Sequence, residues 1–192
     1  MEKEYKYENT TNGLPWLDLR LSEKTMDYLW DAINNGNKDQ ATPFYEQRDT
    51  TKRLIGNISK SHWIDDLADD KDNWFYDNVL KHCVEKMYLR DWNTYYDIHI
   101  AKTTPPPKFT LKEMWVNYQK KHEFSPPHNH VGSFSFVVFV KMPTQLKGAR
   151  EAHTSSFQFI IASSGQTPPA IETVNVPLSP KDEGRMLFFP AW

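Results

Sequence analysis

The feature that most constrains the fold is a series of short strand-like runs in the second half of the chain, with no helical pattern between them. Some runs alternate apolar with polar side chains, and the run at 133–142 is more uniformly apolar, as in a strand covered on both faces. Turns that carry Pro or Gly separate the runs, which lie at 93–102, 111–119, 133–142, 155–162, 172–176 and 185–189. Short strands without intervening helices pair with antiparallel neighbours, so the pattern predicts an antiparallel sandwich or jelly roll over residues 93–192.

Residues 1–92 have a helical pattern instead. Ser22 is a suitable N-cap, because its hydroxyl can accept a free amide hydrogen of the first helical turn. An apolar stripe at helical spacing follows it, formed by Met26, Leu29, Trp30 and Ile33. The sequence Asn34-Asn35-Gly36 predicts the end of this helix.

A second helix is expected from about Asp72 to Leu89, with one apolar and one polar face. The apolar face consists of Tyr76, Val79, Leu80, Cys83 and Met87, and the polar face of Asp77, Lys81, Glu85 and Lys86. The polar stretch 39–60 between the two helices has no assignable pattern. The chain is therefore predicted to be one α+β domain over residues 1–192, with a helical part at 1–92 packed against the β part at 93–192.

Charge and cysteine content exclude several classes of protein. The 192 residues carry 25 acidic and 23 basic side chains, a formal net charge of −2, so neither nucleic acid nor an anionic membrane is expected as the main partner. The single cysteine, Cys83, excludes a disulfide scaffold and a CxxC zinc module. No apolar run approaches the ~20 residues of a membrane span, and the charged N-terminus lacks a secretion signal, so a soluble cytoplasmic protein is expected.

Most of the seven histidines are weak functional signals. His62, His82 and His153 are expected to be solvated or to lie on a helix surface. His122 stands in a polar, turn-like cluster and is expected to be solvated as well. His99 is expected to be a core or hydrogen-bonded residue of its strand.

His128 and His130 differ from the others because they form a pair directly before the most apolar run. Positions i and i+2 of a strand point to the same face, so the two imidazoles can converge on one metal ion. Neutral imidazole nitrogen is a good ligand for Fe(II), Zn(II), Cu(II) or Ni(II). Pro126 and Pro127 stiffen the approach to the pair. An exposed turn that happens to carry two histidines explains the spacing equally well.

Several interpretations of this pair compete. The HNH nuclease motif is spread over a ββα unit, and this chain has no basic face, so that interpretation is rejected. A cupin places a glutamate a few residues after its histidines, where this chain has Phe134, Ser135 and Phe136. A non-haem Fe(II) oxygenase uses two histidines and usually one carboxylate, which leaves positions open for a co-substrate and O₂. A non-catalytic jelly-roll binding module that keeps a vestigial pair is the remaining alternative.

Short motifs then follow one another in a recognisable order. They are Trp115-Val116-Asn117-Tyr118, Pro126 to Ser133, Ser135 with Val137 to Pro143, and Lys181 to Trp192, preceded by Leu54 to Ile58. In this order, the segment from residue 54 to residue 192 resembles the 2-oxoglutarate/Fe(II) oxygenases of phages and marine bacteria, which are prolyl-4-hydroxylase-like.

The resemblance implies a double-stranded β-helix (jelly roll) with the N-terminal helices packed on it, and Fe(II) and 2-oxoglutarate as cofactors. It implies that His128 is the first metal ligand and that His130 occupies the second ligand position. Asn117 and Tyr118 are then expected to donate to 2-oxoglutarate, although ordinary packing explains Tyr118 equally well. Ser135 can be a plain strand residue.

The resemblance also implies that part of the site is missing. In relatives, the distal histidine and the basic residue that binds 2-oxoglutarate follow the last motif, which places both beyond Trp192. Because two ligands hold Fe(II) more weakly than three, the chain as given is expected to have little or no oxygenase activity. The jelly roll is expected to lack its last strand, and the unpaired sheet edge near Trp192 would then favour a homodimer. The substrate cannot be inferred from the sequence.

Overall fold

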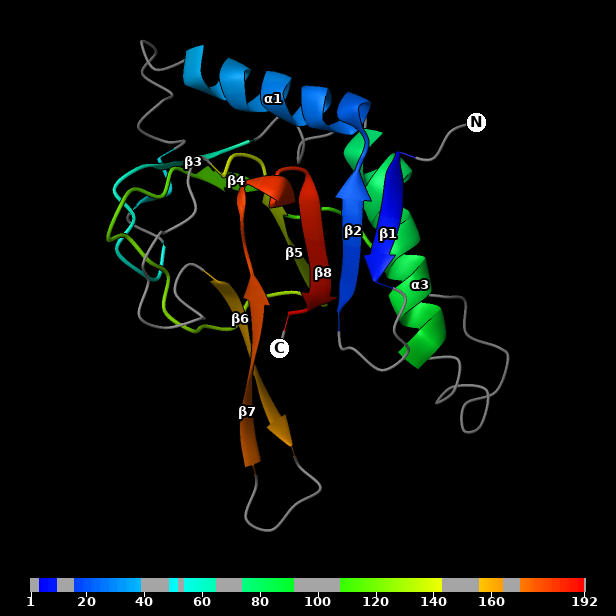
Figure 1. Ribbon diagram of the computed structural model, residues 1–192. Coiled ribbons are helices and arrows are strands. Elements are labelled where there is room, and N and C mark those ends of the chain that lie inside the picture. The colour runs from blue at the N-terminus through cyan, green and yellow to red at the C-terminus, as the bar shows by residue number, and fades with distance from the viewer. Residues whose placement is uncertain are drawn as a thin grey trace.

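The computed structural model describes residues 4–9, 16–38, 49–51, 54–64, 74–91, 108–142, 156–163 and 170–191 (Figure 1). The main sheet consists of four strands, β1 (Tyr5–Asn9), β2 (Leu17–Leu21), β5 (Phe134–Phe139) and β8 (Arg185–Pro190). Their order across the sheet is β1-β2-β8-β5, and every neighbouring pair is antiparallel. Strands from the two ends of the chain are therefore joined in one sheet.

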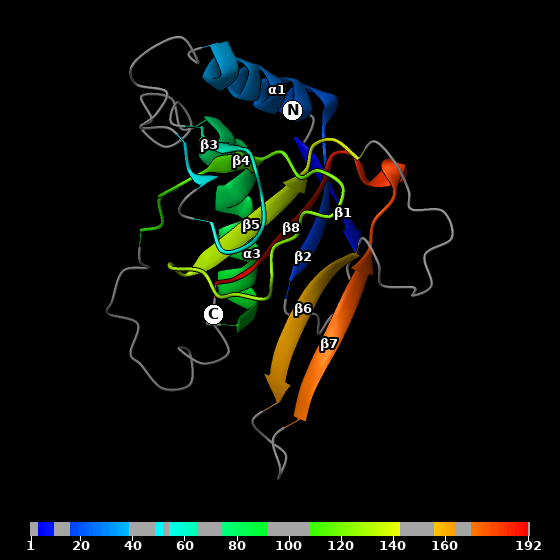
Figure 2. The ribbon, with the colours of Figure 1, turned by 90° about the vertical axis from the view of Figure 1, so that its left-hand side faces the viewer.

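Two smaller antiparallel pairs complete the described strands. β3 (Ser61–Trp63) pairs with β4 (Trp115–Asn117), and β6 (Ser156–Ser163) pairs with β7 (Ala170–Pro177). Figure 2 shows β6 and β7 side by side as a two-stranded ribbon that extends beyond the main sheet. The strand runs predicted from 111–119 onward are thus all found, with shifted ends, whereas the run at 93–102 lies outside the described residues.

The main sheet is covered on both faces, and strand β8 shows why. Met186 and Phe188 are buried on one face, in a core shared with the helices and the leucines of β2. Leu187 is buried on the opposite face with Phe189 beside it, in a second core that includes Phe157 from the ribbon. Because side chains alternate along a strand, one short apolar segment fills two cores.

Helix α1 (Glu23–Lys38) begins where the sequence predicts it. The hydroxyl of Ser22 accepts a hydrogen bond from the backbone N–H of Thr25 at 3.1 Å, which confirms the N-cap. Leu29 and Ile33 are buried, as the apolar stripe predicts. The helix continues past Asn34-Asn35-Gly36 to Lys38, so the predicted end is two residues too early.

The second predicted helix is also present. Residues 74 and 75 are helical, a π-helix η4 (Tyr76–Leu80) follows, and α3 (Lys81–Asp91) continues the segment. Its predicted apolar face is buried at Val79, Leu80, Cys83 and Met87, while Tyr76 is half-buried. The periodicity of this stretch therefore identified the face that packs on the sheet.

Residues 1–92 are not only helical, since they contribute β1, β2 and β3. Residues 17–21 alternate in the pattern of a strand, and Leu17, Leu19 and Leu21 all point into the core shared with the helices. The sequence analysis missed this strand because its partner, β8, lies more than 160 residues away along the chain.

The exposed edge expected near the C-terminus is a second correction. β8 pairs with β2 on one side and with β5 on the other, so the last strand is internal to the sheet. The unpaired edge therefore no longer supports the predicted homodimer, which stays an untested prediction. No helix in the described part of the chain is long and apolar enough to span a membrane.

Candidate metal site

The rings of His128 and His130 lie close together in the loop before β5. Their centroids are 4.7 Å apart, with an angle of 50° between the ring planes. The loop is not itself a strand, since β5 begins only at Phe134. The two imidazoles nevertheless lie next to each other, as two ligands of one ion would.

The loop that carries the pair is fastened to the end of β8. The backbone N–H of His130 donates to the carbonyl oxygen of Ala191 at 2.8 Å, and the N–H of Ala191 donates to the carbonyl oxygen of Ser133 at 3.2 Å. Both views in Figures 1 and 2 show the loop passing the C-terminal end of β8. These two bonds fix the backbone on which the histidines stand.

The hydrogen bond of His128 determines which of its nitrogens is available. Its Nδ1 lies 2.7 Å from the carbonyl oxygen of Pro126. Because a carbonyl only accepts, Nδ1 must carry the proton in this bond, and Nε2 of the neutral ring keeps its lone pair. An imidazole oriented by a backbone carbonyl in this way is a common arrangement of metal-binding histidines.

His130 is half-buried, and its surroundings favour the neutral ring. Burial lowers its pKa from the usual value, and the neighbouring His128 lowers it further. The rings of Trp115 and Phe189 lie 6.5 Å and 6.3 Å from that of His130. A neutral imidazole beside aromatic rings retains the lone pair that a metal ligand needs.

The His pair stands at one end of the apolar core between the main sheet and the ribbon. Phe189 contacts Phe157 and Phe159 at ring-centroid distances of 5.9 Å and 5.2 Å. Phe159 stacks in turn on Trp16 at 4.3 Å. A rigid aromatic cluster therefore supports the side of the site formed by β8.

Asn117 lies on β4, two residues after Trp115, so both side chains extend from the same face of that strand. Its Oδ1 accepts a hydrogen bond from the hydroxyl of Ser61 at 2.7 Å. The Ser61 hydroxyl is buried and is itself 2.6 Å from the hydroxyl of Thr50. This arrangement fixes the carboxamide of the exposed Asn117 with its NH₂ group away from Ser61.

Tyr118 is placed differently. Its ring stacks on the ring of His62 at 5.5 Å, and the ammonium group of Lys60 lies 4.5 Å from its centroid. Tyr118 also packs against the core together with Val116. The structure therefore places Tyr118 against the core, and its contact with 2-oxoglutarate stays a prediction.

The predicted exposure of the other histidines is confirmed for some of them and wrong for His62. His62 is fully buried opposite Val116, so the expectation that it is solvated was wrong. Other elements bury the short strand β3, and a sequence of only three residues gives no pattern from which that burial could be predicted. His82 and His122 are exposed, as predicted, whereas His99 and His153 lie outside the described residues.

Within the described ranges, no group of three or more His, Cys, Asp or Glu side chains is arranged to hold a metal ion. In this part of the chain, His128 and His130 therefore have no third His, Cys, Asp or Glu side chain grouped with them. Ser135 on β5 is half-buried and lies opposite Phe189, which is an ordinary strand position.

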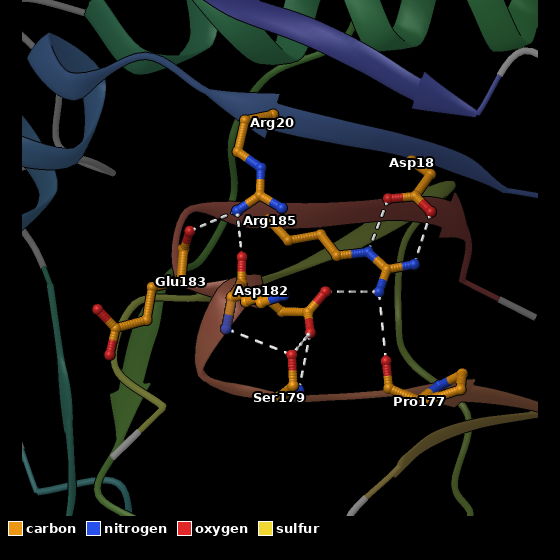
Figure 3. A network of polar contacts seen from close by, with 8 residues as sticks. Asp18, Arg20, Pro177, Ser179, Asp182, Glu183 and Arg185 are labelled. Atoms are coloured by element: carbon orange, nitrogen blue, oxygen red, sulfur yellow. Dashed lines mark hydrogen bonds and ion pairs between the residues drawn. The ribbon is translucent and has the colours of Figure 1, made fainter. Parts of the chain in front are cut away.

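A buried ion pair holds the strand that supports the site (Figure 3). Nε and Nη2 of Arg185 donate to the two carboxylate oxygens of Asp18 at 2.9 Å and 2.7 Å, and Nη1 donates to Asp182 at 2.9 Å. The hydrogen bond to Asp18 is the main cause that raises the pKa of Arg185. Its donors are engaged by these carboxylates, so Arg185 is a structural residue that joins β2 to β8.

The turn before β8 belongs to the same network. Ser179 and Asp182 form a reciprocal capping box, and Arg20 donates to the carbonyl oxygens of Lys181 and Glu183. Burial raises the pKa of the Asp182 carboxyl, but hydrogen bonds from Ser179 and Arg185 outweigh it, and the net pKa is lowered. The sequence analysis missed this network, although Asp18 and Arg20 within the alternating strand and the capping-box spacing of Ser179 and Asp182 are local signals for it.

Comparison with known proteins gives one match. Residues 113–192 match the model of a protein family described as "Putative 2OG-Fe(II) oxygenase". The matched segment runs from just before β4 to the end of the chain and includes Asn117, Tyr118, His128 and His130. No curated protein matches the chain, and no solved structure matches it.

Proposed function

We propose that this chain forms an Fe(II)/2-oxoglutarate-dependent dioxygenase (hydroxylase) domain built on a jelly roll. The observation that carries the proposal is the pair of imidazoles, 4.7 Å apart, on a loop fastened to the end of β8. The family match over residues 113–192 supports the same chemistry. The antiparallel sheet that faces the β6–β7 ribbon supports a jelly roll, with the His pair at one end of the shared core.

The donor set fits Fe(II). Imidazole nitrogen is a preferred ligand of non-haem iron, and Nε2 of His128 is left available by the hydrogen bond to Pro126. His130 would supply the second nitrogen from a half-buried position. When bound, iron and 2-oxoglutarate supply the oxidation of a substrate C–H bond by O₂.

Residues of the chain orient the co-substrate and exclude water. Asn117 would donate an N–H to a carboxylate of 2-oxoglutarate, because Ser61 already occupies its carbonyl oxygen. Trp115 and Phe189 cover His130 with apolar surface, which strengthens charge interactions beside it. Tyr118 would act indirectly, by packing on His62 behind the strand that carries Asn117.

Low activity is part of the same proposal. Two imidazoles bind iron more weakly than a set of three protein ligands, so weak binding and slow turnover are expected of a site whose protein ligands are His128 and His130 alone. Binding is therefore a better test than turnover.

The test is to add Fe(II) and then 2-oxoglutarate to the protein without oxygen and record the visible absorption spectrum. A weak charge-transfer band that His128→Ala abolishes would support the proposal. The matched control is His82→Ala, which removes an exposed imidazole on α3 and should leave the band unchanged.

Two outcomes would contradict the proposal. Binding of neither iron nor 2-oxoglutarate would favour a non-catalytic jelly-roll binding module. Binding of metal through His128 without any response to 2-oxoglutarate would favour a cupin-type metal protein.

A further inference from the structure

Two loops meet immediately before the His pair. Asn57 and Phe124 form an antiparallel bridge, with hydrogen bonds from N–H to carbonyl oxygen of 2.9 Å and 3.3 Å. At Gly56, where φ is +134°, a Cβ atom would lie 2.6 Å from the carbonyl oxygen of Phe124. Only glycine allows so close an approach, so the segments 54–59 and 119–126 form one rigid unit.

This unit presents apolar side chains to solvent. The exposed fractions of Ile55 and Phe124 are 56% and 58%, and that of Val131, beside His130, is 88%. Of the five large apolar side chains that are exposed among the described residues, these three stand on the joined segments 54–59 and 119–126 or on the loop of the His pair. We call them the apolar rim. Phe124 is four residues before His128, so their Cα atoms are at most about 14 Å apart.

Exposed apolar side chains on segments that adjoin a candidate site favour a surface that becomes covered. Single apolar residues on a surface need no explanation, but a group on adjoining loops is typical of an interaction site. Ile55, Phe124 and Val131 are all exposed, so they lie on the surface and not in an enclosed pocket. A polypeptide segment suits such a surface better than a small metabolite does.

The positive charge beside the apolar rim indicates which kind of polypeptide would bind. Lys120 and Lys121 are exposed on the turn that leads to Phe124. The carboxylate of Glu123 is already engaged, since it accepts hydrogen bonds from the backbone N–H groups of Ser59 at 3.1 Å and Lys120 at 2.8 Å. The pKa of Glu123 is lowered, first by a side-chain hydrogen bond with Ser59 and then by these backbone bonds and the charge of Lys120. The charge of Lys120 also acts on Glu123, whereas the exposed ammonium group of Lys121 can face a negatively charged ligand.

We infer that the apolar rim, with Lys120 and Lys121, docks an acidic polypeptide segment that carries apolar side chains, and delivers it to the His pair. The apolar side chains of the segment would cover Ile55, Phe124 and Val131, and its carboxylates would face the two lysines. That this segment is the substrate rests on the proposed oxygenase function. Docking itself requires only the rim and the two lysines.

The test measures binding of a short fluorescein-labelled peptide of alternating glutamate and leucine by fluorescence anisotropy. Ile55→Ser with Phe124→Ser should weaken binding by about tenfold or more. Lys120→Glu with Lys121→Glu should weaken it as well, and added salt should reduce the affinity of the unmodified protein.

Matched control variants keep the test specific. Ile160→Ser with Ile171→Ser removes two apolar side chains that are exposed to a similar degree, 50% and 74%, on the β6–β7 ribbon. Lys81→Glu with Lys112→Glu reverses two exposed lysines elsewhere. Both controls should bind the peptide as the unmodified protein does. Circular dichroism of each variant should match that of the unmodified protein.

The inference is overturned if the peptide does not bind, or if the ribbon variant loses as much affinity as the rim variant. Equal binding of a peptide of glutamate and serine would show that apolar contacts contribute nothing. Tighter binding of a labelled single-stranded DNA would assign the surface to nucleic acid instead.

The same measurements separate this inference from the proposed function. Peptide binding is recorded with a metal chelator present and again with Fe(II) and 2-oxoglutarate. Binding in both conditions without the charge-transfer band would leave a docking surface and refute the oxygenase. The band without peptide binding would refute the docking surface alone.

Discussion

Removal of the charge of Asp18 should destabilise the whole domain. The carboxylate is almost fully buried, with 4% of its side chain exposed, and accepts two charge-assisted hydrogen bonds from Arg185. Asp18→Asn keeps the shape but places an NH₂ group against guanidinium donors. Breaking a buried ion pair costs about 3–5 kcal/mol. Because Arg185 keeps its bond to Asp182, we expect the lower end of that range, about 3 kcal/mol.

Urea denaturation followed by tryptophan fluorescence measures this loss. With a denaturant slope of about 2 kcal/mol per M, the midpoint of unfolding should fall by about 1.5 M. The matched control is Lys141→Met, because Lys141 and Glu183 form an exposed ion pair at 3.8 Å. An exposed pair contributes at most about 1 kcal/mol, so the control should shift the midpoint by less than about 0.5 M.

The reasoning would be refuted if Asp18→Asn shifted the midpoint no more than the control does. A double-mutant cycle with Arg185→Met gives a second criterion. The coupling free energy between the two positions should exceed about 1 kcal/mol, since the groups are in direct contact. A coupling near zero would mean that the pair joins β2 to β8 without stabilising them.

Three further predictions concern single residues. Gly56→Ala should lower the thermal midpoint of unfolding more than Gly184→Ala does. The Cβ added at Gly56 would lie 2.6 Å from the backbone oxygen of Phe124, whereas that added at Gly184 would lie 3.6 Å from the flexible side chain of Met26. Equal losses would contradict the tight loop contact. Burial raises the pKa of Cys83 to about 12, so an aromatic disulfide reagent should label it only after unfolding, and rapid labelling of native protein would contradict its burial. The lowered pKa of Asp182 means that the unfolded chain binds more protons on acidification, so its stabilising contribution is present above about pH 4 and is lost as the pH falls through the folded pKa. Urea midpoints measured from neutral to acid pH should therefore fall less steeply for Asp182→Asn, and parallel curves would refute this assignment.

The helices were predicted well because their signals are local. The N-cap at Ser22 and the spacing of Leu29 and Ile33 lie within a few residues of one another, and the structure shows the cap bond and the buried stripe. The apolar face of the second helix is equally visible in its period. Such patterns depend on the geometry of one element and on no distant partner.

The strands and the site were predicted less completely. Residues 17–21 become a strand through pairing with β8. The unpaired edge expected at the C-terminal strand is absent, because β8 is hydrogen-bonded to β2 on one side and to β5 on the other. His62 is buried by surrounding elements, although its local sequence is polar. Pairing partners far apart in the sequence leave no local pattern that would identify them.

The sequence by itself determined which residues have the chemistry of a metal site, because two histidines at i and i+2 beside an apolar strand carry that potential in any fold. The tertiary structure decided their arrangement. The bond of His130 to Ala191 positions the loop, the bond of His128 to Pro126 selects its tautomer, and the buried carboxylate of Asp18 holds β8 beneath them. The contacts of His130 with Ala191 and of Asp18 with Arg185 join segments that only folding brings together, and burial of the two cores that β8 shares stabilises that arrangement.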